Sequence, residues 1–450
     1  MIEFLLERFA RQAGDEAVVW NDSSYTYGWL IDRIREWQRT ITQSAIATGS
    51  VVAIEADFSP SSVALFLALI ERRCVLVPLT SSVETKKTEF QEIAQIEVSV
   101  QIDAADQTTI VTRNVSASHP YYQSLREAGH PGLVLFSSGS TGKSKAAVHD
   151  LISLLEKFKV VRHKRRTIPF LLFDHIGGVN TMLYSLSNGG CLITVRERSP
   201  DRVLRAVEQH RADLLPASPT FLNLVLLSEA YKRHTIATLQ TITYGTEPMP
   251  ESTLKRFHEL FPGITLLQTY GLSEVGILRS KSKSSNSLWV KVGGEGFSTR
   301  VVDGILQIKA QSAMLGYLNA SNPFTADGWF NTGDSVEVDG EYIKILGRKS
   351  EIITVGGEKV YPAEVESVIQ EVRGVAEVTV YGEVNLIMGH LVCAKIRLVD
   401  GLDVDRGAFL HRLKLHCRER MQAFKVPTRL RLEDGEQYSA RFKKMRNIDA

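Results

Sequence analysis

Short apolar runs alternate with helical stretches along the first half of the chain. From Val51, an apolar run, a turn at Pro60, a helical stretch to about Ile70 and a second apolar run at residues 74–79 follow one another. This order is typical of a βαβ unit with a buried, parallel sheet. The alternation recurs at residues 133–136 before 151–158, 170–173 before 180–186, and 241–244 before 251–261. The bulk of the chain is therefore expected to be α/β.

Beyond this region the pattern changes to polar residues and hairpins. The stretch RSKSKSSNS, which starts at Arg279, predicts a flexible polar loop. Two later stretches, VVDGILQIKA and DGEYIKILG, each place an Asp-Gly pair beside alternating apolar residues. Asp-Gly in this setting favours a β-hairpin, so we expect two hairpins here.

The last hundred or so residues read as a separate unit. Pro362 stands where the first turn of a helix tolerates proline, and apolar residues then recur at helical spacing up to Val372. Two apolar stretches, VAEVTVYGE and LVCAKIRLV, predict strands, and a basic helix is expected around residues 409–421. We place the boundary after Gly347, which gives an N-terminal domain at 1–347 and a C-terminal domain at 348–450.

Length and charge narrow the classes of protein to consider. The chain has 450 residues, 44% of them hydrophobic, with 53 basic and 51 acidic side chains and a formal net charge of +2. Because single cores stop growing at about 250 to 300 residues, two or more folding units are expected. A net charge near zero supplies no overall field for a polyanion, so a general nucleic-acid-binding protein is not expected.

Membrane and export signals are also not expected. The longest apolar run, residues 63–70, is much shorter than the roughly 20 residues that cross a bilayer. Glu3, Glu7 and Arg8 interrupt the apolar start, which would break a signal-peptide core. We therefore predict a cytoplasmic protein with no membrane span. The cysteines Cys74, Cys191, Cys393 and Cys417 form no CxxC pair, which predicts ordinary thiols.

The strongest local motif is LVLFSSGSTGKSK, residues 133–145. After an apolar run it presents glycines, hydroxyls and lysines, which are the donors that a polyphosphate needs. The alternative is a Ser/Gly-rich surface turn. A Walker P-loop would require glycine at Ser137, so that motif fails by one residue. The candidate phosphate-binding residues are Ser137, Ser138, Gly139, Ser140, Thr141, Gly142 and Lys145.

Further motifs follow this loop in a fixed order. They are Tyr244-Gly-Thr-Glu-Pro-Met-Pro, Tyr270-Gly-Leu-Ser-Glu, Gly328-Trp-Phe-Asn-Thr-Gly-Asp, Gly347-Arg348, and Val355-Gly-Gly-Glu-Lys-Val-Tyr-Pro-Ala-Glu-Val-Glu. Together with the loop, they resemble the adenylate-forming superfamily of acyl- and aryl-CoA synthetases, peptide-synthetase adenylation domains and luciferases. The resemblance implies a large N-terminal domain with layered α/β/α/β sheets and a small β-rich subdomain. A small α+β C-terminal domain would be joined to it by a hinge.

The resemblance also implies a reaction and its cofactors. Members join a carboxylate to the α-phosphate of ATP, release pyrophosphate and pass the acyl group to a thiol. ATP, Mg²⁺ and CoA are therefore the expected cofactors, and a carboxylic acid is the expected substrate. The alternatives are loading of an acyl or aminoacyl group onto a phosphopantetheinyl carrier protein, a non-catalytic AMP-binding relative, and, more distantly, a P-loop NTPase.

Site residues carry over from the motifs by position. The phosphate loop would hold the β- and γ-phosphates, although Ser144 and Ala146 replace a usual proline and glycine. Glu274 resembles the Mg²⁺ ligand, and Asp334 with Arg348 resembles the pair that binds the ribose hydroxyls. The residues that resemble the adenine wall are Thr246, Glu247, Pro248, Tyr270 and Gly271. Ser273 is a further nucleotide-binding position. The glycines Gly356 and Gly357 would face the pantetheine arm.

The terminal motif departs most from the family. Relatives commonly end with Thr-x-x-Gly-Lys, whereas this chain has Ser439-Ala-Arg-Phe-Lys-Lys-Met-Arg. Counting back from Arg446 aligns Lys443 with the catalytic lysine, with Lys444 as the competitor and a basic tail as the alternative. The hinge position aligns with Ser350.

The acyl end of the site is predicted at Phe173-Asp-His-Ile-Gly-Gly. His175 matches the residue that borders the acyl pocket and thiol tunnel, although it could instead be a core histidine. Asp174 falls one place too early to match the aspartate of amino-acid-activating relatives, which favours a simple acyl or aryl acid. The basic run KFKVVRHKRR, residues 157–166, reads as a solvated face or as a dock for CoA phosphates or an acidic carrier protein.

Overall fold

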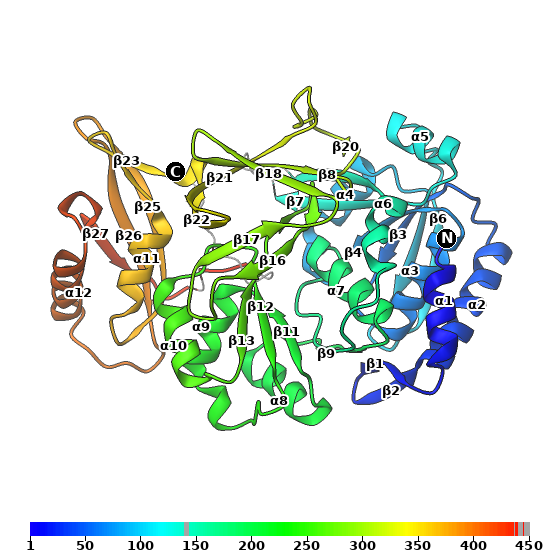
Figure 1. Cartoon of the computed structure of the whole chain (residues 1–450), viewed down its shortest axis with the longest axis horizontal. Helices are drawn as coiled ribbons and strands as arrows, with labels where there is room; N and C mark the ends of the chain where they lie inside the picture. Colours follow the sequence, from blue (N-terminus) through cyan, green and yellow to red (C-terminus); the bar gives the residue numbers. More distant parts are fainter. Residues whose placement is uncertain (139–143, 436, 440–443, 445–450) are drawn as a thin grey trace.

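Two helices, α3 (Pro60–Glu71) and α7 (Ile176–Ser187), lie between two β-sheets at the centre of the large N-terminal domain (Figure 1). The computed structural model describes residues 1–138, 144–435, 437–439 and 444. Helix α3 begins at a capping box, in which Ser59 Oγ accepts from the Ser62 amide and Ser62 Oγ accepts from the Ser59 amide. Its residues are buried from Pro60 to Ile70 because both sheets cover it.

The first sheet carries the expected βαβ unit. Strand β3 precedes α3 in the sequence and β4 follows it, and the two strands pair in parallel, as predicted. The parallel centre is flanked by antiparallel strands, and β8, which the sequence did not predict, pairs with β7 as a hairpin. The order is β20 (Gly316–Tyr317), β8 (Ser144–Asp150), β7 (Gly132–Ser138), β4 (Val75–Leu79), β3 (Val51–Glu55), β5 (Val98–Ile102), β6 (Thr108–Thr112).

The second sheet is parallel except at its β1–β2 edge. The strand expected at residues 170–173 is wrong, because the strand before α7 is β9 (Arg166–Thr167). Helix α7 packs so closely against the segment that precedes it that a Cβ on Gly178 would lie 1.8 Å from the Leu172 carbonyl oxygen. The order is β13 (Thr265–Gln268), β12 (Thr241–Tyr244), β11 (Leu214–Ala217), β9, β10 (Cys191–Ile193), β1 (Glu16–Trp20), β2 (Ser23–Thr26).

Further helices complete the layers of this domain. Helices α4 (Lys87–Ile93) and α5 (Pro120–Ala128) cover the outer face of the first sheet. Helices α8 (Pro200–His210), α9 (Pro219–Ser228) and α10 (Glu251–Leu260) cover the outer face of the second. The remaining helices are α1 (Glu3–Arg11), α2 (Tyr27–Gln43), α6 (Leu151–Leu155), and the 3₁₀ helices η1 (Ser81–Lys86), η2 (Glu156–Phe158) and η3 (Ala230–Lys232).

A β-rich subdomain follows, with its own small core. Both Asp-Gly hairpins are confirmed; in the first, Asp303 and Gly304 have φ of 51° and 73°, as a type I′ turn requires. The polar stretch at Arg279 is partly a strand instead of a loop, because β16 pairs with β17. The order is β16 (Arg279–Ser282), β17 (Trp289–Gly293), β22 (Tyr342–Arg348), β21 (Phe330–Asp339), β19 (Ile305–Ala310), β18 (Phe297–Val302). A separate pair, β14 (Gly271–Leu272) and β15 (Gly276–Ile277), precedes it.

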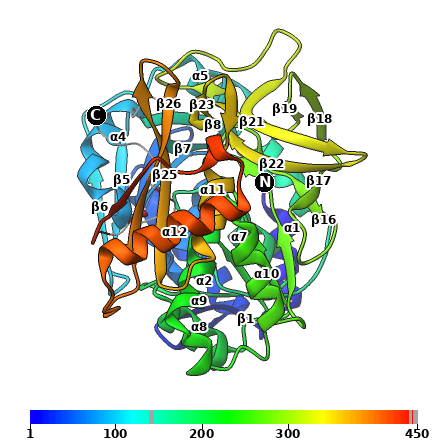
Figure 2. The same cartoon turned by 90° about the vertical axis from the view of Figure 1, so that its left-hand side faces the viewer.

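The small C-terminal domain has a separate hydrophobic core. Figure 2 looks onto it and shows α12 (Arg406–Arg420) crossing in front of α11 (Pro362–Gln370). Its sheet has the order β24 (Glu358–Val360), β23 (Ile353–Val355), β26 (Gly389–Leu398), β25 (Val375–Asn385), with β27 (Arg429–Leu432) beside β26. The 3₁₀ helix η4 (Lys349–Glu351) precedes this sheet, and η5 (Ala423–Lys425) lies between α12 and β27 in the sequence. The layered large domain, the β-rich subdomain and this α+β domain confirm the expected fold class; the boundary at 347/348 and the hinge stay predictions.

All four cysteines are buried and unpaired. Burial raises the pKa of Cys74 to about 12, and that of Cys191, Cys393 and Cys417 to about 11. In the described part of the chain, no helix combines the length and apolar character that a membrane crossing requires.

Candidate functional site

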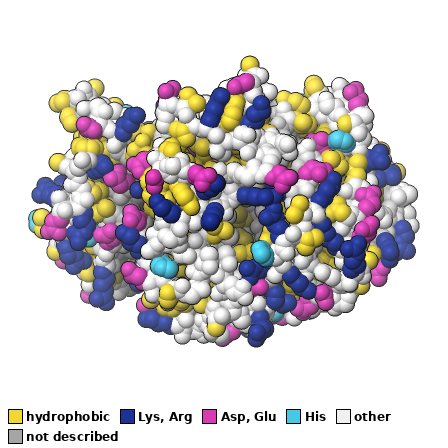
Figure 3. Space-filling view, viewed as in Figure 1, with side chains coloured by type: hydrophobic (Ala, Val, Ile, Leu, Met, Phe, Trp, Pro, Cys, Tyr) yellow, Lys and Arg dark blue, Asp and Glu magenta, His cyan; other side chains and the backbone are white. Residues whose placement is uncertain are grey.

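A cavity of about 630 Å³ lies where the first sheet, the second sheet, the β-rich subdomain and the start of the C-terminal domain meet. Parallel strands β11 and β12 direct their carboxyl ends toward it, at Ala217 and at Gly245 and Thr246. This is where open α/β sheets place ligands. On the face shown in Figure 3, basic and acidic side chains are interspersed, so the few charges that line the cavity dominate its local field.

Eight of the fifteen predicted residues that the structure describes line this cavity. They are Ser137, Lys145, His175, Thr246, Gly271, Ser273, Glu274 and Arg348. Ser138 ends β7 directly beyond Ser137. Five predicted residues, Gly139, Ser140, Thr141, Gly142 and Lys443, lie outside the described residues.

The predicted phosphate loop connects the two arms of a β-hairpin. Ser137 pairs with Lys145 across β7 and β8, and Ser138 pairs with Ser144. A Walker P-loop leads into a helix. In this chain strand β8 follows the loop, where a P-loop NTPase would have a helix. The structure therefore does not fit the P-loop NTPase alternative.

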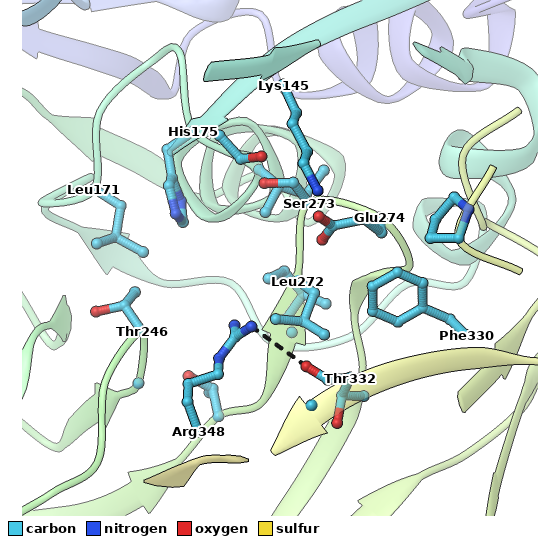
Figure 4. Close-up of a pocket in the computed structure, with 18 of the residues that line it drawn as sticks. Lys145, Leu171, His175, Thr246, Leu272, Ser273, Glu274, Phe330, Thr332 and Arg348 are labelled. Atoms are coloured by element: carbon cyan, nitrogen blue, oxygen red, sulfur yellow. Dashed lines mark hydrogen bonds between the residues drawn. The ribbon is translucent and has the colours of Figure 1, made fainter. Parts of the chain in front are cut away.

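Glu274 lies in the turn between β14 and β15 and points into the cavity together with Lys145 (Figure 4). Its Oε1 accepts a hydrogen bond from the Tyr317 hydroxyl at 2.5 Å. Its backbone carbonyl accepts from the Met314 amide at 2.8 Å. Tyr317 was not predicted from the sequence. Burial and the neighbouring Glu274 charge raise the pKa of Tyr317.

The donor set around Glu274 fits a Mg²⁺ ion that is held mainly by a ligand. Among the described residues, no group of three or more His, Cys, Asp or Glu side chains could hold a metal. Mg²⁺ usually takes one or two carboxylates, with phosphate oxygens and water as its other ligands. Glu274 has one oxygen bound by Tyr317 and, in the described part of the chain, no hydrogen bond to the other. A single cavity carboxylate with a free oxygen suits this mode of binding.

Asp334 and Arg348, the predicted ribose pair, lie together on the β21–β22 hairpin. Arg348 Nε is 2.8 Å from Asp334 Oδ1, and Arg348 Nη1 donates to the Thr332 carbonyl at 3.3 Å (Figure 4). The other Asp334 oxygen accepts from the Tyr270 hydroxyl. Burial raises the pKa of Asp334, which the positive charge of Arg348 opposes. Arg348 lines the cavity, whereas Asp334 and Tyr270 lie behind it.

Two features distinguish Thr246 at the predicted adenine wall. Its φ is +75°, which is rare and strained for a β-branched residue. Its hydroxyl is buried and has no hydrogen-bond partner among the described residues. Strain and an unsatisfied polar atom at a cavity wall both indicate a ligand-binding position.

Glu247 and Pro248 are not among the residues that line the cavity. Glu247 Oε1 accepts from the Thr220 amide at 2.8 Å, and Oε2 accepts from the Lys444 amide at 3.1 Å. The carboxylate therefore points toward helix α9 and the end of the chain. The assignment of Glu247 to the adenine wall stays a prediction.

Apolar side chains also line the cavity, together with His175. His175 caps α7, because its Nδ1 accepts from the Gly177 amide at 3.0 Å, and its ring lines the cavity. The apolar neighbours, which the sequence did not identify, are Leu171, Ile176, Pro216, Ala217, Leu272 and Ile277. Asp174 is buried and accepts from the Thr80 hydroxyl at 2.9 Å instead of lining the cavity.

The C-terminal domain contributes to the wall through its first residues. Lys349 and Ser350 line the cavity. The predicted Gly356 and Gly357 form the β23–β24 turn and do not line the cavity. Gly356 donates its amide to the Met388 carbonyl at 2.8 Å.

Most of the basic run at 157–166 is a solvated face, because residues 159–164 are exposed. Lys157 donates to the Ile277 carbonyl at 3.1 Å, and burial lowers the pKa of Lys157 to about 8. Lys164 pairs with Asp15 at 2.7 Å, and Arg166 pairs with Glu16 at 2.6 Å. These contacts tie Lys157, Lys164 and Arg166 to the large domain.

Comparison with known proteins gives matches along most of the chain. A family model described as AMP-binding enzyme matches residues 5–303, and one described as AMP-binding enzyme C-terminal domain matches residues 364–436. An indoleacetate–CoA ligase of Aromatoleum aromaticum is 26% identical over 471 aligned positions, covering 92% of this chain and 91% of that protein.

Two further proteins are similar over different lengths. The long-chain-fatty-acid–CoA ligase FadD13 of Mycobacterium tuberculosis is 28% identical over 319 positions, covering 66% of this chain and 62% of that protein. The crystal structure of the anthranilate CoA ligase AuaEII in complex with anthranoyl-AMP superposes with a TM-score of 0.82. It covers 99% of this chain and 95% of that chain at 18% identity, which shows a shared fold.

Proposed function

The chain belongs to the AMP-binding enzyme family, and we propose that it is an acid–thiol ligase that uses ATP, Mg²⁺ and CoA. It converts a carboxylic acid to an acyl-adenylate and transfers the acyl group to the thiol of CoA. The observation that carries the proposal is that Lys145, Glu274, His175 and Arg348 line one and the same cavity. The CoA ligases among its relatives support the same reaction.

In the first step a carboxylate oxygen attacks the α-phosphorus of ATP, and the bond to the β-phosphate breaks to release pyrophosphate. Lys145 and the phosphate loop bind the β- and γ-phosphates, while Asp334 and Arg348 bind the ribose. Lys443 bridges the carboxylate and the α-phosphate, which offsets the repulsion between two anions. Glu274 holds Mg²⁺, which supplies charge neutralisation on the phosphates when bound.

In the second step the CoA thiol attacks the acyl carbonyl, and AMP leaves. Lys443 must first withdraw, and the Gly356-Gly357 turn must approach the pantetheine arm. Lys349 and Ser350 line the cavity directly after Arg348, so a rotation at Ser350 would change this wall. That position supports a hinge there and a domain boundary at 347/348.

The acid is of the acyl or aryl class and lacks an α-ammonium group. Leu171, Ile176, Ala217 and other apolar side chains line the cavity together with His175. Asp174, which directly precedes His175 in the sequence, is hydrogen-bonded to Thr80 and does not line the cavity. A substrate ammonium would therefore find no carboxylate partner in Asp174.

ATP–pyrophosphate exchange over a panel of aryl, short-chain, long-chain and amino acids tests the first step. We expect exchange with one of the aryl or acyl acids and none after chelation of Mg²⁺. A chain that binds AMP but exchanges with no acid would instead be the non-catalytic relative. Thioester formation with CoA, compared with a phosphopantetheinyl carrier protein, identifies the acceptor; turnover with the carrier alone would make it a carrier-loading enzyme.

A further inference from the structure

Tyr317 contacts two opposite charges in the cavity. Its hydroxyl donates to Glu274 Oε1 at 2.5 Å, and the Lys145 ammonium lies 5.2 Å from the centroid of its ring. We propose that Tyr317 is a positioning residue that prevents Lys145 and Glu274 from pairing, so that the ammonium stays available for phosphate and the carboxylate for Mg²⁺. This inference rests on the proposed function.

The two charges have reason to pair without such a separator. Lys145 and Glu274 point into the same cavity (Figure 4), where attraction between opposite charges exceeds that in bulk water. Yet the described residues include no ion pair of Lys145 with Glu274 or with any other carboxylate. The ring face attracts the ammonium through a cation–π contact instead.

Backbone pairing fixes Tyr317 relative to Lys145. Strand β20 pairs antiparallel with β8, so that Tyr317 stands opposite Ala147. Lys145 is two residues before Ala147 on the same strand face, which makes it a diagonal neighbour of Tyr317. Asn319 fastens the start of β8, because its side chain accepts from the Ala146 amide at 3.0 Å and donates to the Ser144 carbonyl at 2.9 Å.

The hydroxyl also sets the orientation of the carboxylate. It engages one oxygen of Glu274 and leaves the other for a cation.

Two substitutions separate the contributions of the hydroxyl and the ring. Tyr317→Phe removes only the hydroxyl, and Tyr317→Leu removes the ring face as well. Binding of Mn²⁺ to the enzyme–ATP complex, followed by electron paramagnetic resonance, reports the metal site without turnover. We expect Tyr317→Phe to weaken the binding of Mn²⁺ about tenfold and to leave the binding of ATP without metal unchanged. Tyr317→Leu should additionally weaken metal-free ATP binding, because Lys145 can then pair with Glu274.

A matched control and a double variant make the test specific. Tyr122 is a buried tyrosine whose hydroxyl donates to the Ala94 carbonyl at 2.9 Å, on the outer side of the first sheet; Tyr122→Phe should leave Mn²⁺ binding unchanged. In a Glu274→Gln background, Tyr317→Phe should cause no further loss.

Unchanged Mn²⁺ affinity in Tyr317→Phe, or an equal loss in the Glu274→Gln background, would overturn the inference. A wild-type chain that binds Mn²⁺ and ATP but exchanges with no acid would refute the proposed function while leaving this inference standing.

Discussion

The Lys444 ammonium lies 2.9 Å from Glu366 Oε2, and the two side chains are 11% and 1% exposed. Glu366 belongs to α11 in the C-terminal core, and its other oxygen accepts from the Val380 amide at 3.0 Å. The Lys444 amide reaches Glu247 in the large domain. The ammonium of Lys444, the competitor for the catalytic lysine, is therefore held in the C-terminal domain, and we infer a structural role for it.

Lys444→Ala should destabilise the protein because it removes the ion pair between Lys444 and the buried Glu366 carboxylate. Removing one partner of a buried pair costs about 3–5 kcal/mol, which denaturant unfolding would measure. The double variant Lys444→Met with Glu366→Gln should recover most of this loss, since the amide oxygen can still accept from Val380. Full stability in Lys444→Ala combined with lost adenylation would reverse the assignment of the two lysines.

Lys443→Ala should abolish only the first half-reaction. Without its charge, the carboxylate and the α-phosphate repel one another, and adenylate formation should fall by about a hundredfold or more. Conversion of supplied acyl-adenylate to thioester should continue. Single-turnover measurement of each half-reaction checks this, with Lys444→Arg as the control that keeps a cation beside Glu366. Equal losses in both half-reactions would contradict the prediction.

Glu274→Gln should impair metal-dependent catalysis while it preserves the hydrogen bond from Tyr317. Loss of the carboxylate charge should slow adenylation by about a hundredfold, and a higher Mg²⁺ concentration should restore part of the rate. The control is Glu341→Gln, an exposed carboxylate that pairs with Lys291 on a hairpin. A Mg²⁺ dependence identical to that of the wild type would remove Glu274 from the metal site.

His149 should make the protein sensitive to acid. It is buried on β8 beside the backbone of Ser273 and Ser312, and burial lowers its pKa from 6.5 to about 4. Between these pH values the unfolded chain binds a proton that the folded chain does not, so stability is full above pH 6.5 and falls as the pH falls toward 4.

The loss from this one group is on the order of 3 kcal/mol, from 1.36 kcal/mol per pKa unit. His149→Gln should flatten the acid limb of a stability profile measured by denaturant unfolding, and His163→Gln, at an exposed position, should not. An unchanged acid limb in His149→Gln would show that another group sets it.

Sequence patterns predicted the elements whose signals are local. The βαβ unit from Val51 to Leu79 and the hairpin at Asp303-Gly304 each depend on neighbouring residues. The apolar stretch at 170–173 was wrongly predicted to be a strand. Its residues Phe170 and Phe173 are buried in the core but lie outside the strands. Strand β16 was missed because its polar residues gain pairing only from β17.

The candidate site shows the same division. Motifs at strand ends and turns identified Lys145, Glu274 and Arg348, which share the cavity. Tyr317 was missed because its position depends on pairing between β20 and β8, which lie far apart in the sequence. The orientation of Glu247 likewise depends on Thr220 and Lys444, two distant parts of the chain.

The burial of all four cysteines has a consequence for an enzyme that generates an electrophile. An acyl-adenylate acylates any accessible thiolate, including those of the protein that made it. With pKa values near 11 or 12, only about one in ten thousand of these thiols, or fewer, is ionised at pH 7. Cys74, Cys191 and Cys417 are also enclosed in hydrophobic cores, and Cys393 is fully buried. We therefore expect the chain to escape self-acylation, so that the thiol delivered by the acceptor is the nucleophile that the activated acid meets.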